Sequence, residues 1–257
     1  MQDSKILKRS ILAAVLALWG CDQRTSDIAA PHAAAAASTA PVVKVARPVS
    51  MDEWKSALLS TYNESDTKDK GDGITESTAN FHKHNGKEGV LMLTFAKRDA
   101  FRKLRFYTFF GSSVLDIADV HTFIKIYISV PDGKKAVFFM RPTYNGKRGW
   151  LFMNKVAIMV DGEVVLEKKF PSLEAKRDVE DGYVHEEDSF IADADEISAL
   201  RKITEKSTVL IRLTGDKGFV NVDKQGVDFF KSDVIDGLYV YDAINEAVES
   251  HLPPSTD

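Results

Sequence analysis

The 257-residue sequence has a single cysteine and no apolar segment of membrane-spanning length, and each scarcity excludes a class of structure. Cys21 has no second cysteine to pair with, which excludes an intramolecular disulfide. The apolar run from Ile11 to Gly20 is far shorter than the roughly 20 residues of a membrane-spanning helix. The glycines at 215 and 218 lack the Lys-Ser or Lys-Thr ending of a P-loop, so no phosphate-binding loop is present there.

A strong positive charge is also missing. The chain holds 34 Lys and Arg against 38 Asp and Glu, a formal net charge of −4, whereas nucleic-acid-binding domains are basic. We therefore expect no nucleic-acid partner. The charge is uneven, because residues 48–177 hold 21 basic and 16 acidic residues while residues 178–257 hold 7 and 19. Either these two parts pair within one fold, or the acidic part contacts a basic protein partner.

The start of the sequence has the pattern of a targeting segment. Three basic residues precede the apolar run, and the small residue Gly20 lies directly before Cys21. A basic start, a short apolar run and a small residue at the cleavage site are the features of a secretory signal peptide. We expect residues 1–20 to be such a peptide.

The residues Leu18-Trp19-Gly20-Cys21 resemble the lipobox of bacterial lipoproteins. The resemblance implies that Cys21 is the lipidation site and becomes the first residue of the mature chain. It further implies a membrane as a partner, held through two or more acyl chains, which is what stable anchoring requires. The location implied is the periplasmic side of the bacterial cell envelope. Asp22 slightly favours the inner membrane, with the outer membrane as the alternative.

The rest of the chain divides by composition. Residues 21–47 hold no aromatic residue and many Ala, Pro, Ser and Thr, so they bury too little apolar surface to offset the entropy of ordering. We expect the lipidated cysteine and a flexible tether there. Residues 48–252 are long enough for one sizeable core and are predicted to form a single globular domain. Residues 253–257 are predicted to be a disordered tail.

Strand patterns dominate the predicted domain. Segments rich in Phe, Ile, Val and Tyr predict strands at 90–95, 104–110, 122–130 and 135–140. Isoleucines at 124, 126 and 128 alternate with more polar residues, which is typical of a strand with one buried face. Asp161-Gly162 predicts a tight type I′ hairpin turn between 156–160 and 164–168. Further strands are expected at 181–190, 208–213 and 219–222.

Helices are expected at the two ends of the domain and between its late strands. Ser50 with Glu53, and Asp193 with Glu196, have the spacing of a capping box, and residues 225–249 show an apolar helical stripe. Asp132-Gly133 and Asn145-Gly146 predict turns. The polar stretch 63–85 is interpreted as a solvated loop. Its acidic residues do not have the spacing of an EF-hand calcium site. The predicted fold is a β-rich α+β domain: an antiparallel β-sandwich or curled sheet with a few flanking helices.

Three groups of residues are candidates for chemistry. His82 and His84 have a zinc-chelating spacing on a strand, but a site would need His121 or the cluster 185–187 to complete it. Ser113 follows Gly111 as in a nucleophile elbow, with Asp116 or Asp119 and His121 as partners, yet Leu115 stands where the second glycine belongs. Glu186, Glu187 and Asp188 offer paired acids for glycan cleavage, or a solvated strand edge. We expect no metal, no cofactor and no catalytic residue among them.

Aromatic and basic residues interleave between 98 and 110. Such a pattern suits an anionic polymer or a lipid headgroup, and it also suits a strand with one face in the core. On a strand, Phe106, Thr108 and Phe110 lie on one side, whereas Arg105, Tyr107 and Phe109 lie on the other. We expect one of these sides to be core and leave the other open.

The sequence supports two functional hypotheses. In the first, the protein is a membrane-anchored envelope lipoprotein whose domain is a non-enzymatic binding module: an inhibitor, an immunity-type protein or an accessory factor. In the alternative, it is a tethered hydrolase, metal-dependent or glycan-directed, that uses the histidines or the acids at 185–188. The first is favoured because catalysis needs several polar groups converging in a sheltered pocket, and the sequence contains no established motif for one.

Overall fold

The computed structural model describes residues 50–82, 91–118, 122–147, 149–171, 175–180 and 182–252. These residues belong to one unit of the chain, 46–257. The predicted signal peptide, Cys21, the tether and the tail lie outside the described residues, and so do His84, Asp119 and His121.

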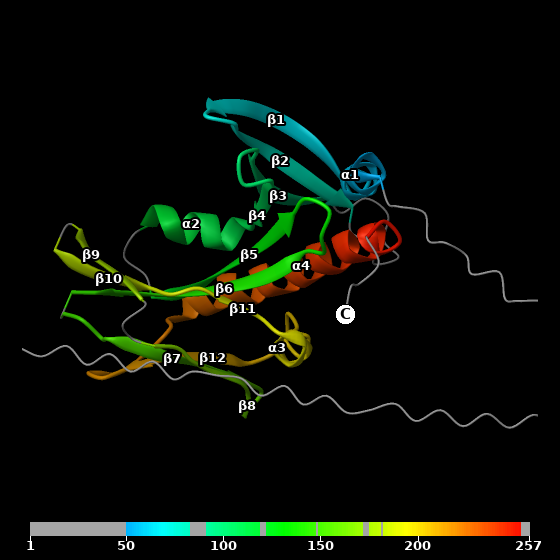
Figure 1. The fold of residues 1–257 in the computed structure, drawn as a ribbon. Helices are drawn as coiled ribbons and strands as arrows, with labels where there is room; N and C mark the ends of the chain where they lie inside the picture. The colour runs from blue at the N-terminus through cyan, green and yellow to red at the C-terminus, as the bar shows by residue number, and fades with distance from the viewer. Residues whose placement is uncertain are drawn as a thin grey trace, which may run out of the picture. The chain divides into compact units, whose positions relative to one another are not determined.

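The described part of the chain is mainly β, with 48% of residues in strands and 26% in helices, which confirms the predicted β-rich α+β class. The strands form two antiparallel sheets, and helices pack against both (Figure 1).

The larger sheet has nine strands among the described residues. Their order is β1-β2-β3-β4-β5-β6-β10-β9, and β11 pairs with β6 beside β10. The bounds are β1 Tyr62–Gly71, β2 Ile74–His82, β3 Leu91–Asp99, β4 Leu104–Thr108, β5 Phe123–Pro131, β6 Val137–Gly146, β9 Lys176–Glu180, β10 Tyr183–Glu187 and β11 Phe190–Ile191.

The smaller sheet has the order β13-β12-β7-β8. Its bounds are β7 Met153–Val160, β8 Glu163–Lys169, β12 Val209–Gly215 and β13 Gly218–Asn221. The predicted hairpin at Asp161-Gly162 is confirmed, with φ values of 52° and 90° that suit a type I′ turn.

Several predicted connections were wrong. The polar stretch from 63 is not a loop but the β1–β2 hairpin, whose turn residues Asp72 and Gly73 have φ values of 49° and 71°. Asn145-Gly146 end β6 instead of forming a turn. The single strand expected at 181–190 is instead the pair β10 and β11, both lying along the edge of β6.

Helices α1 Met51–Leu59, α2 Phe110–Ala118, α3 Ala194–Leu200 and α4 Lys224–Glu249 complete the described fold. Both predicted capping boxes are present, at the starts of α1 and α3. Helix α2 was not predicted: the strand expected over 104–110 ends at Thr108, and the chain turns into α2 at Phe110. The reason is a long-range contact to α4, which is described below.

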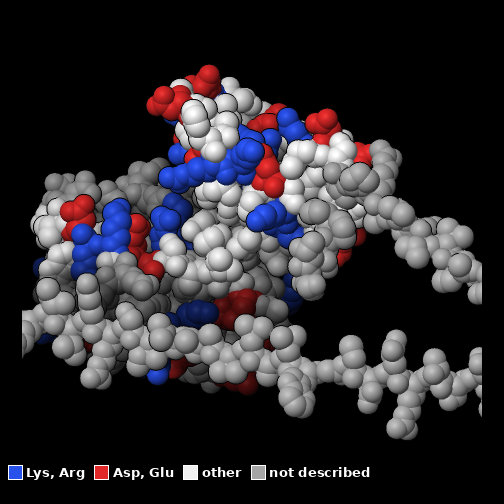
Figure 2. All heavy atoms as spheres, viewed as in Figure 1, with Lys and Arg blue, Asp and Glu red and all other residues white. Residues whose placement is uncertain are grey.

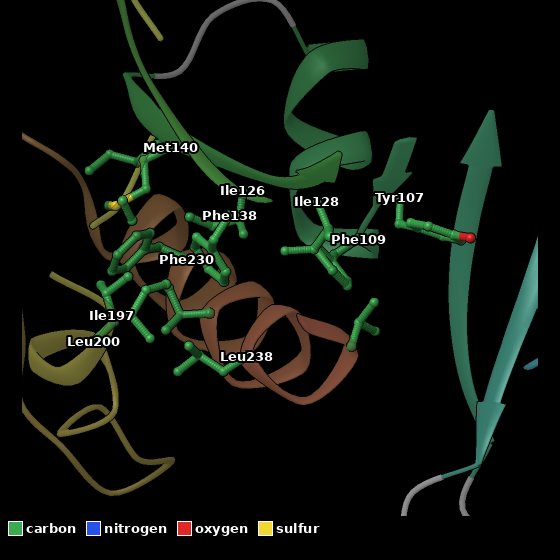
Figure 3. Packing of buried hydrophobic residues seen from close by; sticks show 14 of the residues in the cluster. Tyr107, Phe109, Ile126, Ile128, Phe138, Met140, Ile197, Leu200, Phe230 and Leu238 are labelled. Atoms are coloured by element: carbon green, nitrogen blue, oxygen red, sulfur yellow. The ribbon is translucent and has the colours of Figure 1, made fainter. Parts of the chain in front are cut away.

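The core lies between the larger sheet, α4 and α3 and continues to the inner face of the smaller sheet. Helix α4 packs closely on β5 and β6 at Gly237, where a Cβ atom would lie 3.1–3.3 Å from side chains of Ile126, Phe138 and Phe109. Two helical turns before Gly237, Phe230 lies near Ile197 and Leu200 of α3 in the same cluster (Figure 3). This packing decides which face of each sheet points inward, and therefore which face remains for binding.

Candidate binding surfaces

The Gly111-Ser112-Ser113 segment opens α2 and its hydroxyls are used by the fold. Ser112 is buried; its Oγ donates to Asp233 at 2.5 Å and accepts from the backbone N–H of Ile126 at 3.2 Å. The Oγ of Ser113 donates to the carbonyl of Phe109 at 2.9 Å. The geometry is that of a helix start fixed by a buried acid, not of a nucleophile elbow.

Asp233 of α4 is the acid that fixes α2. Besides the Ser112 hydroxyl, it accepts the backbone N–H groups of Gly111 at 3.0 Å and Ser112 at 2.6 Å. Burial raises the pKa of Asp233 to about 6, although these three donors favour the carboxylate and oppose the rise. Asp233 thus joins two helices across a separation of 121 residues in the chain, and no sequence pattern marked it.

The acids at 186 and 187 lie on opposite faces of the larger sheet, because adjacent strand residues alternate. Glu186 is fully buried and accepts backbone N–H groups of Leu151, Phe152 and Met153 at 2.5–2.9 Å, while the Nε of Arg177 lies 3.4 Å away. It therefore holds the connection that leads into β7.

Glu187 faces outward. Partial burial raises its pKa, but the nearby cations Arg141 and Lys176 outweigh this and lower the pKa below its ordinary value. Two acids on opposite faces cannot flank one glycosidic bond, so Glu186 and Glu187 do not form a glycan-cleaving pair with each other.

The histidines that the structure describes do not form a metal centre. His185 Nδ1 lies 2.7 Å from Asn145 Oδ1, and its Nε2 lies 3.5 Å from Glu187. Within the described ranges, no three His, Cys, Asp or Glu side chains are grouped so as to hold a metal ion. His82 ends β2, and its two hypothetical partners lie outside those ranges.

A groove of about 360 Å³ lies on the outer face of the smaller sheet. We define the groove by its lining residues: Lys155, Ala157, Met159, Val164, Glu167, Leu210, Arg212, Thr214 and Phe219. Three of its apolar side chains are largely exposed: Val164 by 54%, Leu210 by 41% and Phe219 by 58%. The solvent face of an antiparallel sheet is normally polar, so the apolar floor makes this groove a candidate contact surface.

Charged groups border this apolar floor. Lys155 Nζ lies 3.3 Å from Glu167, across the β7–β8 pair. The guanidinium of Arg212 lies 4.3 Å from the centre of the Phe219 ring and donates to Asn221 at 3.1 Å. The groove therefore combines an apolar centre with a polar edge, the arrangement of many protein interfaces.

A second surface lies on the outer side of the larger sheet, across β3 to β6. We define this aromatic–basic face by seven residues: Phe95, Lys97, Phe106, Lys125, Tyr127, Phe139 and Arg141. They alternate with core residues and lie in adjacent register positions. Figure 2 shows Lys and Arg side chains among uncharged residues, with some Asp and Glu beside them, on the side toward the viewer.

The rings of this face contact one another. Tyr127 stacks on Phe139, with ring centres 4.7 Å apart and planes 8° from parallel, and Phe106 lies 6.5 Å from Tyr127. The guanidinium of Arg141 lies 5.3 Å from the Tyr127 ring centre. The question left open by the sequence is thereby answered: Tyr107 and Phe109 are core, whereas Phe106 belongs to the outer side.

Many acids of the C-terminal third have structural roles. Glu186 and Asp233 are buried, Asp193 and Asp223 cap α3 and α4, and Asp242 and Glu249 pair with Arg201 and Lys135. The excess of acidic residues in 178–257 is therefore partly explained by capping and ion pairing within one fold.

Comparison with known proteins found no matching family model, no matching curated protein and no matching solved structure. No helix of the described residues is long and apolar enough to cross a membrane. Functional inference therefore depends on this chain's own residues.

Proposed function

We propose that this protein is a bacterial envelope lipoprotein, anchored through Cys21 on the periplasmic side, whose domain binds a partner protein without catalysing a reaction. The signal peptide and the lipobox resemblance support the anchor. The groove on the smaller sheet carries the binding part of the proposal.

The composition of the groove favours a protein partner. Fully burying an exposed side chain of this size contributes roughly 1.5–3 kcal/mol. Val164, Leu210 and Phe219 are 41–58% exposed, so each would contribute about half of that on contact. Arginine and aromatic residues are enriched among the residues that dominate binding energy, and Arg212 and Phe219 lie together at one end. Because the floor is apolar and the charges lie at its border, a partner surface with an apolar centre would fit.

The alternative hydrolase has less support from the same geometry. A catalytic acid or nucleophile needs access to a substrate, but Ser112, Asp233 and Glu186 are buried and bonded to the fold. In the groove, Lys155 and Glu167 form an ion pair, and neither is beside a described histidine or serine.

Photo-crosslinking in living bacteria tests the binding proposal. A photoreactive amino acid replaces Val164 in the groove or, as a control, Ile191 on β11; both side chains are 54% exposed. We expect one crosslinked species of defined mass from position 164 and none from 191. Adding Leu210→Glu to the protein with the photoreactive residue at position 164 should abolish this crosslink, because binding would bury a carboxylate at the apolar centre. Identical products from both positions, or none from 164, would contradict the proposal.

A further inference from the structure

We propose that the aromatic–basic face, together with the β3–β4 hairpin, binds the surface of an anionic phospholipid bilayer. The domain would then lie against the membrane instead of moving freely on its tether. The inference rests on the proposed function only for the nearness of a membrane, since the residues that carry it belong to the domain itself.

Charge is the first observation. Residues 91–147 hold ten Lys and Arg against four Asp and Glu. On the outer side of β3 to β6, the cations are Lys97, Lys125 and Arg141, and the acid Asp99 lies 3.6 Å from Arg102 in the hairpin turn. Glu187 of the neighbouring strand β10 lies 3.7 Å from Arg141 and offsets part of its charge. Anionic lipid headgroups attract such cations, by roughly fivefold in affinity for each one near the surface.

Exposed phenylalanine is the second observation. Phe95 on β3 is 46% exposed and Phe101 in the β3–β4 turn 82%. The ring of Phe101 packs closely against Gly73 of the β1–β2 turn, because a Cβ atom at Gly73 would lie only 3.2 Å from that ring. Apolar rings held outward among cations are what an interfacial membrane contact requires.

The ring geometry favours a bilayer over an anionic polysaccharide. The central ring, Tyr127, has Phe139 stacked on one face and Arg141 5.3 Å from its centre, so less of it is free to stack on a sugar. The most exposed rings are phenylalanines, which offer no hydroxyl for a sugar hydrogen bond but enter an acyl boundary at little cost. The groove lies on the other sheet, which leaves it available to a protein.

Vesicle flotation tests this inference. The full chain carries Cys21→Ser, so that no acyl anchor contributes, and is mixed with vesicles of phosphatidylglycerol and phosphatidylcholine or of phosphatidylcholine alone. Phe95→Ser/Phe101→Ser removes two exposed rings, and Lys97→Gln/Arg102→Gln removes two cations. Phe219→Ser and Lys155→Gln in the groove are matched controls. The basic leader is the same in every variant, so differences between variants report on the domain.

We expect flotation with the anionic vesicles to fall at least about tenfold in affinity for the cation variant, given the fivefold effect of each charge. The phenylalanine variant should also lose binding, and both controls should float like the parent. Equal flotation of all variants would overturn the inference, as would retention on immobilised alginate without flotation. Because the chain lacks the acylated cysteine, failure here leaves the anchor and the groove untouched.

Discussion

Replacing Glu186 by glutamine should destabilise the protein severely, although the change removes only a charge. Glu186 is fully buried, and its two carboxylate oxygens accept three backbone N–H groups from residues 151–153. An amide has one acceptor oxygen and one NH₂ donor. Whichever way the glutamine amide turns, its NH₂ group must face at least one backbone donor and cannot bond to it.

The magnitude follows from the hydrogen bonds and the ion pair that the substitution removes. Hydrogen bonds to a charged acceptor contribute about 1.5–3 kcal/mol each, and an orphaned buried donor costs a further 1–3 kcal/mol. Arg177 also loses its buried counter-charge at 3.4 Å, and breaking such a pair costs about 3–5 kcal/mol. Because these effects overlap, we expect a total decrease of about 4 kcal/mol in the free energy of unfolding.

Urea unfolding, followed by circular dichroism, measures this decrease, and the adjacent residue supplies the control. Glu187→Gln removes the same charge from the outward face, where Glu187 pairs with Arg141 and Lys176, and exposed pairs contribute only about 0–1 kcal/mol. A destabilisation by Glu186→Gln no larger than that by Glu187→Gln would refute the assignment of Glu186 as a buried clamp.

Three further predictions concern the fold. Stability should fall by roughly 2 kcal/mol through Asp233 as pH rises from about 4 to 6, because its folded pKa of about 6 exceeds its ordinary value of 3.8 and the native state holds the proton more tightly. Asp233→Asn should remove this slope from urea midpoints measured across that range, and wild-type and variant midpoints that change with pH in parallel would count against it. Gly215→Ala should cost about 3 kcal/mol in thermal unfolding, since a Cβ atom there would overlap the carbonyl oxygens of Leu151 and Phe152; a change within about 0.5 kcal/mol would show that the backbone yields. Arg98→Lys should cost about 1 kcal/mol by losing one of two bonds to Asp132, at 2.6 and 2.8 Å, and unchanged urea midpoints would disprove this.

Local signals in the sequence predicted those parts of the fold that local forces determine. The capping boxes and the Asp161-Gly162 turn depend on residues close together in the chain, and the alternating isoleucines of β5 report one buried face. The β1–β2 hairpin was not predicted, because every residue of β1 after Tyr62 is exposed and the strand therefore has no alternation of apolar and polar residues.

The candidate surfaces were less predictable because they depend on long-range packing. In β7, Ala157 and Met159 are as apolar as their inward-facing neighbours, so the pattern alone could not show which side the helices cover. Likewise, nothing in the acidic run at 186–188 distinguishes the buried Glu186 from its outward-facing neighbour. Helix α2 exists because Asp233, far along the chain, binds its first N–H groups.

Metabolic labelling with a fatty acid tests the central claim, the anchor at Cys21, most directly. The full chain and its Cys21→Ser variant are expressed in a bacterium supplied with labelled palmitate, and the protein is isolated under denaturing conditions. The proposed anchor predicts label in the wild-type protein and none in the variant. Equal label in both, or no label in either, would contradict it.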